Sequence, residues 1–358
     1  MNSLKKVRIV GAGLLGTSLG LALKSQGVVV DFSDLNPTHL ALARDLVGFT
    51  SSSQSELSPE LVVIATPSAA FREIIREEFR LNPQTIFIDL ASTKTESILE
   101  VEMITDLAPL FCGTHPMAGR ENGGPHGARS DLFLGRPWVL SPTSTTQPEV
   151  LSYVEDLVRS LGAIPIMMSA PEHDRAVALI SHLPQLTSSL LAKQLSGGPE
   201  TWLALSGQGL RDTTRIAASD PHLWTGIIFE NREQLRPLLV GLRGDLDALI
   251  AGLDQPGVTE TLLKDGRHGR SMIPGKHGGK SREYTYLPIV IEDQAGQLAS
   301  LFNECAKILV NVEDLTIEHS PGQFTGLITL ALSKKDAELL SQHLLASGWN
   351  VHAPRQGQ

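Results

Sequence analysis

The sequence of 358 residues has few cysteines, no long apolar run and no excess of positive charge. Its two cysteines, Cys112 and Cys305, form neither a disulfide framework nor a metal-binding cluster, and they fit a reducing cytoplasm. No apolar run reaches the roughly 18 residues that a transmembrane helix needs, and the N-terminal apolar stretch lacks the cleavage site of a signal peptide. The formal net charge of -9 excludes a broad field for nucleic acid or anionic lipid, so an anionic ligand requires local arginines.

Residues 1–170 alternate short apolar runs with helical patterns. The runs VRIVGAG, VVVDFSD, ELVVIATP and TIFIDLAS are typical of strands, and the segments between them have helical spacing. This alternation predicts an α/β domain with a doubly wound parallel sheet of Rossmann type. Residues 171–262 have helical spacing and almost no strand pattern, which predicts an all-helical domain. The high apolar content of these helices favours a homodimer.

Two further segments follow the helical region. Residues 263–283 are rich in glycine and basic residues, which predicts a linker that is either a solvated hinge or a flap contacting an anion. Residues 284–358 contain the pattern βαββαβ, which predicts a small ferredoxin-like α+β domain.

A glycine-rich turn lies between the first predicted strand and the first predicted helix. Gly11 permits the tight turn, Gly13 lets the backbone approach a pyrophosphate, and Gly16 lets the helix close on the sheet. An acid after the second strand would bind the ribose hydroxyls and repel a 2′-phosphate, so NAD is expected rather than NADP. Asp34 fits this role better than Asp31. The predicted cofactor-binding residues are Gly11, Ala12, Gly13, Leu14, Leu15, Gly16, Asp34 and Thr66.

Two segments are expected where a nicotinamide would lie, namely DLASTKTE (89–96) and the loop CGTHPMAGRENGG (112–124). Oxidation of an alcohol by hydride transfer needs a base for the hydroxyl proton, and neutral imidazole suits that role near pH 7. His115 is therefore the candidate base, with Ser92 beside it to orient the imidazole or the substrate oxygen. The alternative is a structural histidine in a surface turn. No metal-ligand spacing is present.

Five motifs in sequence order resemble the prephenate/arogenate dehydrogenases of tyrosine biosynthesis: GAGLLGTSLGLAL, DLASTKTE, THPMAGRENGGPHGARSDLFLGRPWVL, HDRAVALISHLPQL and GLRDTTRIAASDPHLW. The resemblance implies NAD-dependent oxidative decarboxylation of prephenate to 4-hydroxyphenylpyruvate, with His115 as the base and Ser92 next to it. It also implies that residues 171–262 bind the substrate, with roles for Arg215, Ser181, His182 and Trp224. Two further candidate substrate-binding residues, Gln185 and Arg120, stand where the chain departs from the family pattern.

Some alternatives stay open at this point. Many members of the family have a second histidine in the motif SHLPH where this chain has Gln185, so arogenate or both cyclohexadienyl substrates are alternatives to prephenate. Arg120 either contacts a carboxylate or faces solvent. The C-terminal segment resembles an ACT-type regulatory domain, which implies inhibition by L-tyrosine. A non-catalytic NAD and amino-acid sensor is a remote alternative. Another alternative is a β-hydroxyacid dehydrogenase, in which Lys193 would have to serve as the acid/base.

Overall fold

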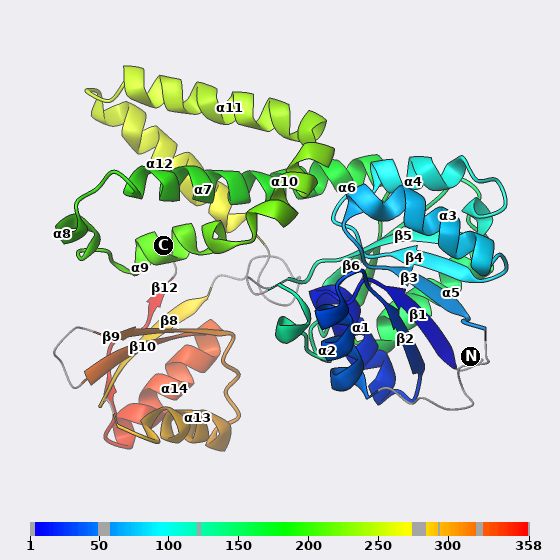
Figure 1. Ribbon diagram of the computed structural model, residues 1–358. Helices are drawn as coiled ribbons and strands as arrows, with labels where there is room; N and C mark the ends of the chain where they lie inside the picture. Colours follow the sequence, from blue (N-terminus) through cyan, green and yellow to red (C-terminus); the bar gives the residue numbers. More distant parts are fainter. Residues whose placement is uncertain are drawn as a thin grey trace. The chain divides into compact units, whose positions relative to one another are not determined.

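The computed structural model describes residues 4–48, 58–119, 123–273, 284–292, 294–319 and 325–356. The chain divides into two compact units, Met1–Leu246 and Asp247–Gln358. Figure 1 shows the α/β layers and helices of the first unit and the small sheet of the second.

The first unit contains a seven-stranded sheet with the strand order β2-β1-β3-β4-β5-β6-β7. Parallel pairing joins β2 to β1, β1 to β3, β3 to β4 and β4 to β5, which confirms the predicted Rossmann-like parallel sheet. Its strands are β1 (Lys6–Val10), β2 (Val29–Ser33), β3 (Leu61–Ile64), β4 (Ile86–Asp89), β5 (Phe111–Pro116), β6 (Pro137–Pro142) and β7 (Ile164–Met167). Its helices are α1 (Leu14–Ser25), α2 (Pro37–Val47), α3 (Phe71–Leu81), α4 (Thr95–Glu102) and α5 (Pro148–Ser160).

Two separate cores lie on the two faces of this sheet. Alternate residues of β3 point to opposite faces, so Leu61 and Val63 belong to one core while Val62 and Ile64 belong to the other. Side chains of α1, α2 and α5 fill the first core, and side chains of α3 and α4 fill the second. Helices therefore cover both faces, as the doubly wound prediction requires.

The structure corrects the prediction for the segment around His115. That segment was expected to be a loop, but Phe111–Pro116 is the fully buried strand β5. Within the sheet, neighbouring strands satisfy the backbone hydrogen bonds of this segment. That gain outweighs the poor strand propensity of glycine and proline. Strand β6 pairs antiparallel with β5, so the sheet is not wholly parallel.

The rest of the first unit is helical, as predicted. Its elements are α6 (Ala170–Val177), the π-helix η5 (Ala178–His182), α7 (Leu183–Leu195), α8 (Glu200–Leu203), α9 (Gln208–Thr214), the 3₁₀-helix η6 (Arg215–Ala218), α10 (Pro221–Glu230) and α11 (Arg232–Ala251), whose end belongs to the second unit. None of the helices in the described part of the chain is long and apolar enough to cross a bilayer.

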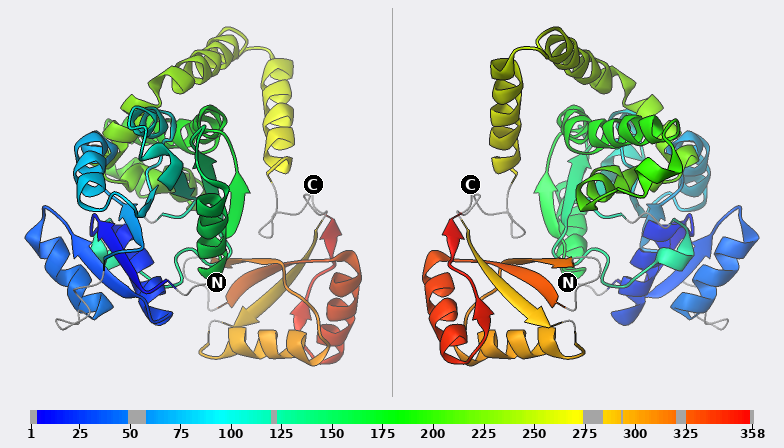
Figure 2. Two further views of the ribbon diagram at one scale, coloured as in Figure 1. Left: turned by 90° about the vertical axis from the view of Figure 1, so that its right-hand side faces the viewer. Right: turned by 90° about the vertical axis from the view of Figure 1, so that its left-hand side faces the viewer.

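The second unit contains the predicted element order βαββαβ, with one helix before it and one further short strand after it. It contains α12 (Pro256–Ser271), β8 (Thr285–Glu292), α13 (Gln297–Lys307), β9 (Asp314–His319), β10 (Thr325–Leu332), α14 (Lys334–Ala346), β11 (Asn350–Val351) and β12 (Arg355–Gln356). The sheet order is β11-β8-β10-β9, and α13 and α14 pack on it through one apolar core (Figure 2). Because α12 continues to Ser271, residues 263–271 of the predicted linker are helical, while residues 274–283 lie outside the described residues.

Candidate active site

The glycine turn has the backbone geometry that a dinucleotide requires. Gly11 has a φ of +109°, and a Cβ atom there would collide with the carbonyl oxygen of Ala65. A Cβ atom at Gly16 would collide with the carbonyl oxygen of Gly11, so the helix can approach the turn only without a side chain at this position. In contrast, a Cβ atom at Gly13 would meet nothing within 4 Å, which leaves open space beside the N-terminus of α1.

The two acidic candidates for the ribose have different surroundings. Asp34 lies directly beyond β2, and its carboxylate accepts hydrogen bonds from the backbone N–H groups of Ala12 (2.6 Å) and Asn36 (2.7 Å). Asp31 instead forms an ion pair with Arg8 at 2.8 Å. The geometry therefore favours Asp34, which contacts the glycine turn and retains lone pairs for the hydroxyl groups of a ribose.

The predicted residue Thr66 supports the fit to a dinucleotide. It follows β3 at the carboxyl edge of the sheet, next to Ala65, which abuts Gly11. Within the described part of the chain, the buried hydroxyl of Thr66 has no hydrogen-bond partner. Buried polar groups are rarely left unpaired, so this hydroxyl fits a polar group of a bound cofactor. The glycine turn, Asp34 and Thr66 together fit NAD.

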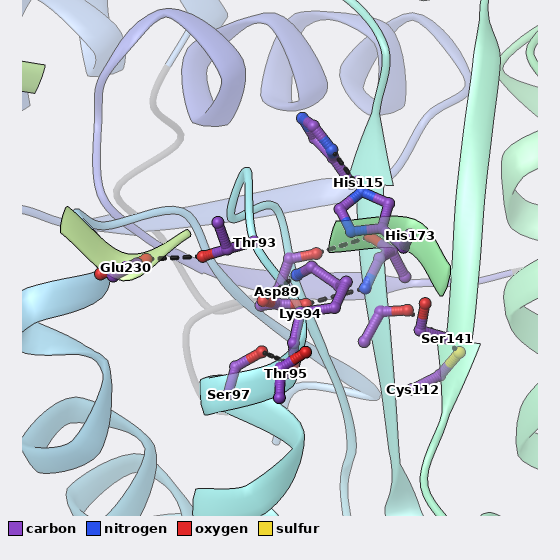
Figure 3. Close-up of polar contacts among 12 residues, drawn as sticks. Asp89, Thr93, Lys94, Thr95, Ser97, Cys112, His115, Ser141, His173 and Glu230 are labelled. Carbon is purple, nitrogen blue, oxygen red and sulfur yellow. Dashed lines mark hydrogen bonds and ion pairs between the residues drawn. The ribbon is translucent and has the colours of Figure 1, made fainter. Parts of the chain in front are cut away.

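His115 stands near the end of β5 and forms part of a buried chain of side chains (Figure 3). Its Nδ1 lies 2.8 Å from Nε2 of His173, and Nδ1 of His173 lies 2.8 Å from a carboxylate oxygen of Asp174. The same carboxylate accepts the backbone N–H groups of Lys94 and Thr95, both at 2.8 Å, where α4 begins. Asp174 therefore joins the histidine chain to the loop that follows β4.

The chain of contacts determines which nitrogen of His115 carries a proton. A carboxylate only accepts hydrogen bonds, so His173 donates from Nδ1 to Asp174. A neutral His173 then accepts at Nε2, and His115 must donate from its Nδ1. Nε2 of His115 is left with a lone pair, as a base requires.

Electrostatics favour the neutral form of His115. Burial lowers its pKa well below 6.5, and the nearby His173 and Lys94 lower it further. Burial alone would raise the pKa of Asp174, but hydrogen bonds from His173, Thr95 and the backbone hold that pKa below its ordinary value. Asp174 is therefore ionised and His115 is neutral at neutral pH.

A buried ion pair supports the loop between β4 and α4. The ammonium of Lys94 contacts the carboxylate of Asp89, and both side chains are fully buried (Figure 3). Asp89 also accepts the backbone N–H of Thr114 at 2.8 Å, which connects the pair to the strand that carries His115. The pair fixes the position of β5 relative to this loop.

The end of α10 connects this network to the helical region. The side-chain amide of Asn231 donates to the carbonyl of Asp174 at 2.7 Å and to Nδ1 of His182 at 3.0 Å. The ring of Trp224 lies edge-on to the ring of His182, with centroids 6.0 Å apart. Thr93 donates to the carboxylate of Glu230 at 2.5 Å (Figure 3). A continuous set of polar contacts therefore runs from His115 to His182.

The π-helical turn that ends at His182 has a local cause. Pro184 lacks an N–H group and cannot donate to the preceding turn, so the regular hydrogen-bond ladder is interrupted there. One wide turn accommodates the interruption, and such turns are frequent at functional sites. The motif SHLP thus places His182 at an irregular point of the helix, against Asn231.

The structure brings some of the predicted residues together and leaves others apart. Gln185 is tied to η6, because its side-chain amide donates to the carbonyl of Ile216 at 2.9 Å. Arg215 begins η6 and is exposed, and Ser181 is half-buried in η5. Among the described residues no hydrogen bond joins Ser92 to His115. Arg120 lies outside the described residues.

Sequence reasoning missed His173, Asp174, Lys94, Asp89 and Asn231, which form most of the buried network. A detectable signal existed for the first two, because they begin the motif HDRAVALISHLPQL, which carries part of the family resemblance. The described residues contain no group of three or more His, Cys, Asp or Glu side chains that could bind a metal.

The first unit contains an imidazole that is held as a proton acceptor and a glycine turn with the geometry for a dinucleotide. This combination indicates a nucleotide-dependent dehydrogenase. Models of two families match the chain: prephenate dehydrogenase, nucleotide-binding domain, over residues 19–167, and prephenate dehydrogenase, dimerization domain, over residues 169–264. The chain belongs to the prephenate dehydrogenase family and is an oxidoreductase.

Similar proteins agree with this assignment. A probable prephenate dehydrogenase, NovF, from Streptomyces niveus is 30% identical over 96% of this chain and 99% of its own length. A cyclohexadienyl dehydrogenase from Zymomonas mobilis is 31% identical over 70% of this chain and 88% of its own length. The crystal structure of A. aeolicus prephenate dehydrogenase in complex with hydroxyphenyl propionate and NAD+ is 29% identical, with a TM-score of 0.68 over 76% of this chain and 99% of that chain.

Proposed function

We propose that this protein oxidises prephenate with NAD and releases 4-hydroxyphenylpyruvate, CO2 and NADH. The observation that carries the proposal is the lone pair on Nε2 of His115, which the contacts of His173 and Asp174 enforce. Bound NAD supplies the acceptor for the hydride that leaves C4 of the substrate. The C4 hydroxyl proton moves to Nε2 of His115, and a dienone forms. Loss of the ring carboxylate as CO2 then leaves an aromatic phenolate, which takes the proton back from Nε2 to give the hydroxyl group of the product.

The partners of His115 stabilise the protonated imidazole. Once Nε2 has accepted the proton, the Nδ1–H group still donates to His173, and His173 still donates to the ionised Asp174. The negative charge of Asp174 thus offsets the positive charge that develops on the two rings. His173 and Asp174 position and stabilise the base, while His115 contacts the substrate.

The cofactor site favours NAD over NADP. Ala12, Gly13, Leu14, Leu15 and the other residues of the turn would hold the pyrophosphate, and the hydroxyl of Thr66 would bond to a polar group of the cofactor. Asp34 would accept the ribose hydroxyls, and its charge would repel a 2′-phosphate. The preference for NAD over NADP therefore depends on the carboxylate of Asp34.

The remaining residues would bind the substrate. Ser92 would orient the C4 hydroxyl, and Arg215 would bind a substrate carboxylate through a bidentate contact. Ser181, His182, Gln185 and Trp224 would surround the opposite end of the molecule. In this scheme residues 1–170 bind the cofactor and residues 171–262 bind the substrate and dimerise. Residues 263–283 connect these parts to a regulatory domain, residues 284–358.

A homodimer and a regulatory ligand belong to the same proposal. Exposed apolar side chains in the region that matches a dimerization domain support the dimer, among them Leu190, Leu191, Trp202, Leu205 and Phe229. The βαββαβ topology supports an ACT-like domain that binds L-tyrosine as an inhibitor. Cys112 and Cys305 are free and buried, which suits a reducing cytoplasm.

The test is a comparison of His115→Asn with the native protein. With prephenate and NAD, the variant should lose a factor of about 10² or more in kcat, because asparagine cannot accept the proton. His268→Asn, on the exposed face of α12, is the control and should keep the native rate. NADH formation measured with NAD and with NADP tests the cofactor preference as well. Normal turnover by His115→Asn would refute the assignment of the base.

A further inference from the structure

The carboxylate of Glu230 lies at a place that helix stability does not explain. Glu230 is the last residue of α10, and the carboxyl end of a helix carries partial negative charge, so a carboxylate there is unfavourable. Within the described part of the chain no ion pair neutralises this charge, and its hydrogen bond comes from the hydroxyl of Thr93 at 2.5 Å. The contact with Thr93 therefore accounts for the position of this carboxylate.

Thr93 lies in the segment that follows β4, and only 5% of the residue is exposed. A carboxylate only accepts hydrogen bonds, so the Thr93 hydroxyl is the donor. Hydrogen bonds to a carboxylate are shorter and stronger than those between neutral groups. Figure 3 shows this contact between the segment after β4 and the end of α10. A helix of the helical region thus holds a buried residue at the carboxyl edge of the sheet.

Ser92, the residue before Thr93, is fixed by its neighbours and not by its own side chain. On one side, the backbone N–H of Leu90 donates to the carbonyl of Ile64 at 2.9 Å. On the other side, Thr93 is bonded to Glu230. Ser92 is half-buried, and its hydroxyl makes no hydrogen bond among the residues that the structure describes. The backbone is therefore held while the hydroxyl stays available for a substrate.

The end of α10 also belongs to the network that surrounds the base. Asn231, which follows Glu230, donates to the carbonyl of Asp174 at 2.7 Å. The carboxylate of Asp174 accepts from His173, the partner of His115. One helix end therefore contacts both the loop after β4 and the residues that orient the base.

We infer that Glu230 is a positioning residue, which acts through Thr93 to hold Ser92 where its hydroxyl meets the C4 hydroxyl of the substrate. The inference rests on the proposed function and concerns the same site. In this role Glu230 contacts neither the substrate nor NAD. A displacement of about 1 Å at a reacting centre can cost a factor of about 10² in rate, so loss of the contact affects kcat more than KM.

The test measures kcat and KM for prephenate with the full-length protein at saturating NAD. Thr93→Val removes the donor and keeps the shape of the side chain, so it should lower kcat about tenfold and change KM less than about twofold. Glu230→Ala removes the acceptor and should have the same effect. Thr93→Ser keeps the donor, Glu230→Gln keeps an acceptor, and both should retain most of the native kcat. Glu233→Gln, which changes an exposed carboxylate at the start of α11, is the matched control and should keep the native values.

A double variant separates positioning from a general structural role. Ser92→Ala should lower kcat by itself, because the hydroxyl that orients the substrate is lost. If Thr93 acts through Ser92, adding Thr93→Val to Ser92→Ala should lower kcat no further, since no hydroxyl remains to be positioned. A general structural role of Thr93 would instead lower kcat by the same factor in both backgrounds.

Each outcome decides the inference. A native kcat in Thr93→Val or in Ser92→Ala overturns it, and so do equal losses from Thr93→Val with and without Ser92→Ala. A loss that appears in KM alone also overturns it. In all these cases turnover of prephenate by the native protein leaves the proposed reaction intact. Urea unfolding identifies a variant that does not fold, and the other of Thr93→Val and Glu230→Ala then decides. No turnover of prephenate by the native protein refutes the proposed function, and the inference with it.

Discussion

At the scale of single residues, the surroundings of His115 are the main finding. The residue type and the place of its segment, expected beside a nicotinamide, are enough to nominate His115 as a base. Its partners are far away in the chain, because His173 and Asp174 come from α6 and reach β5 only in the folded unit. The tautomer of His115 is therefore a property of the tertiary structure.

The pH dependence follows from the lowered pKa of His115. Since the base is the neutral ring, kcat should stay constant from about pH 8 to below pH 6.5 and fall only in more acidic solution. Unfolding restores an ordinary pKa, so the unfolded chain binds more protons below pH 6.5 and the folded state loses stability as the pH falls. Rate profiles and urea unfolding from about pH 5 to pH 9 measure both effects. A half-maximal rate at or above pH 6.5 would contradict this account.

At the scale of elements, the junction between β4 and α4 organises the site. Its backbone N–H groups bind Asp174, and the hydroxyl of Thr93 donates to Glu230. Lys94 pairs with Asp89, which also accepts a backbone N–H from the strand that carries His115. The strand β4 was predicted from its apolar run. The burial of Lys94 was not, since lysine is almost never fully buried unless it is paired.

Breaking the buried pair should destabilise the protein strongly. Lys94→Met leaves the carboxylate of Asp89 buried without its partner and should cost about 3–5 kcal/mol of unfolding free energy. Adding Asp89→Asn should recover part of this loss, because the amide oxygen can still accept from Thr114. Lys264→Met breaks the exposed pair with Glu260 and should cost less than about 1 kcal/mol. Urea unfolding checks all three, and equal losses for Lys94→Met and Lys264→Met would refute the argument.

At the scale of the whole molecule, the chain combines a catalytic unit with a βαββαβ unit. The second unit has its own apolar core between the sheet and α13 and α14. The proposed role for it is binding of L-tyrosine.

Removal of the βαββαβ region tests that role. The full chain should lose activity in millimolar L-tyrosine, whereas a chain that ends after Ser271, where α12 ends, should be insensitive at the same concentration. The initial rate of NADH formation at fixed prephenate gives the readout. Equal inhibition of both chains would assign tyrosine to the active site instead.

The sequence by itself determined the sheet, the helical region, the glycine turn and the candidate base. These features depend on local periodicity, on glycine conformations and on residue chemistry, all of which adjacent residues specify. The tertiary structure decided that FCGTHP is a buried strand, that Asp34 contacts the turn while Asp31 pairs with Arg8, and that Gln185 faces Ile216 through its nitrogen. Each of these depends on contacts between distant segments, and a hydrogen-bond direction is fixed only when both partners are in place.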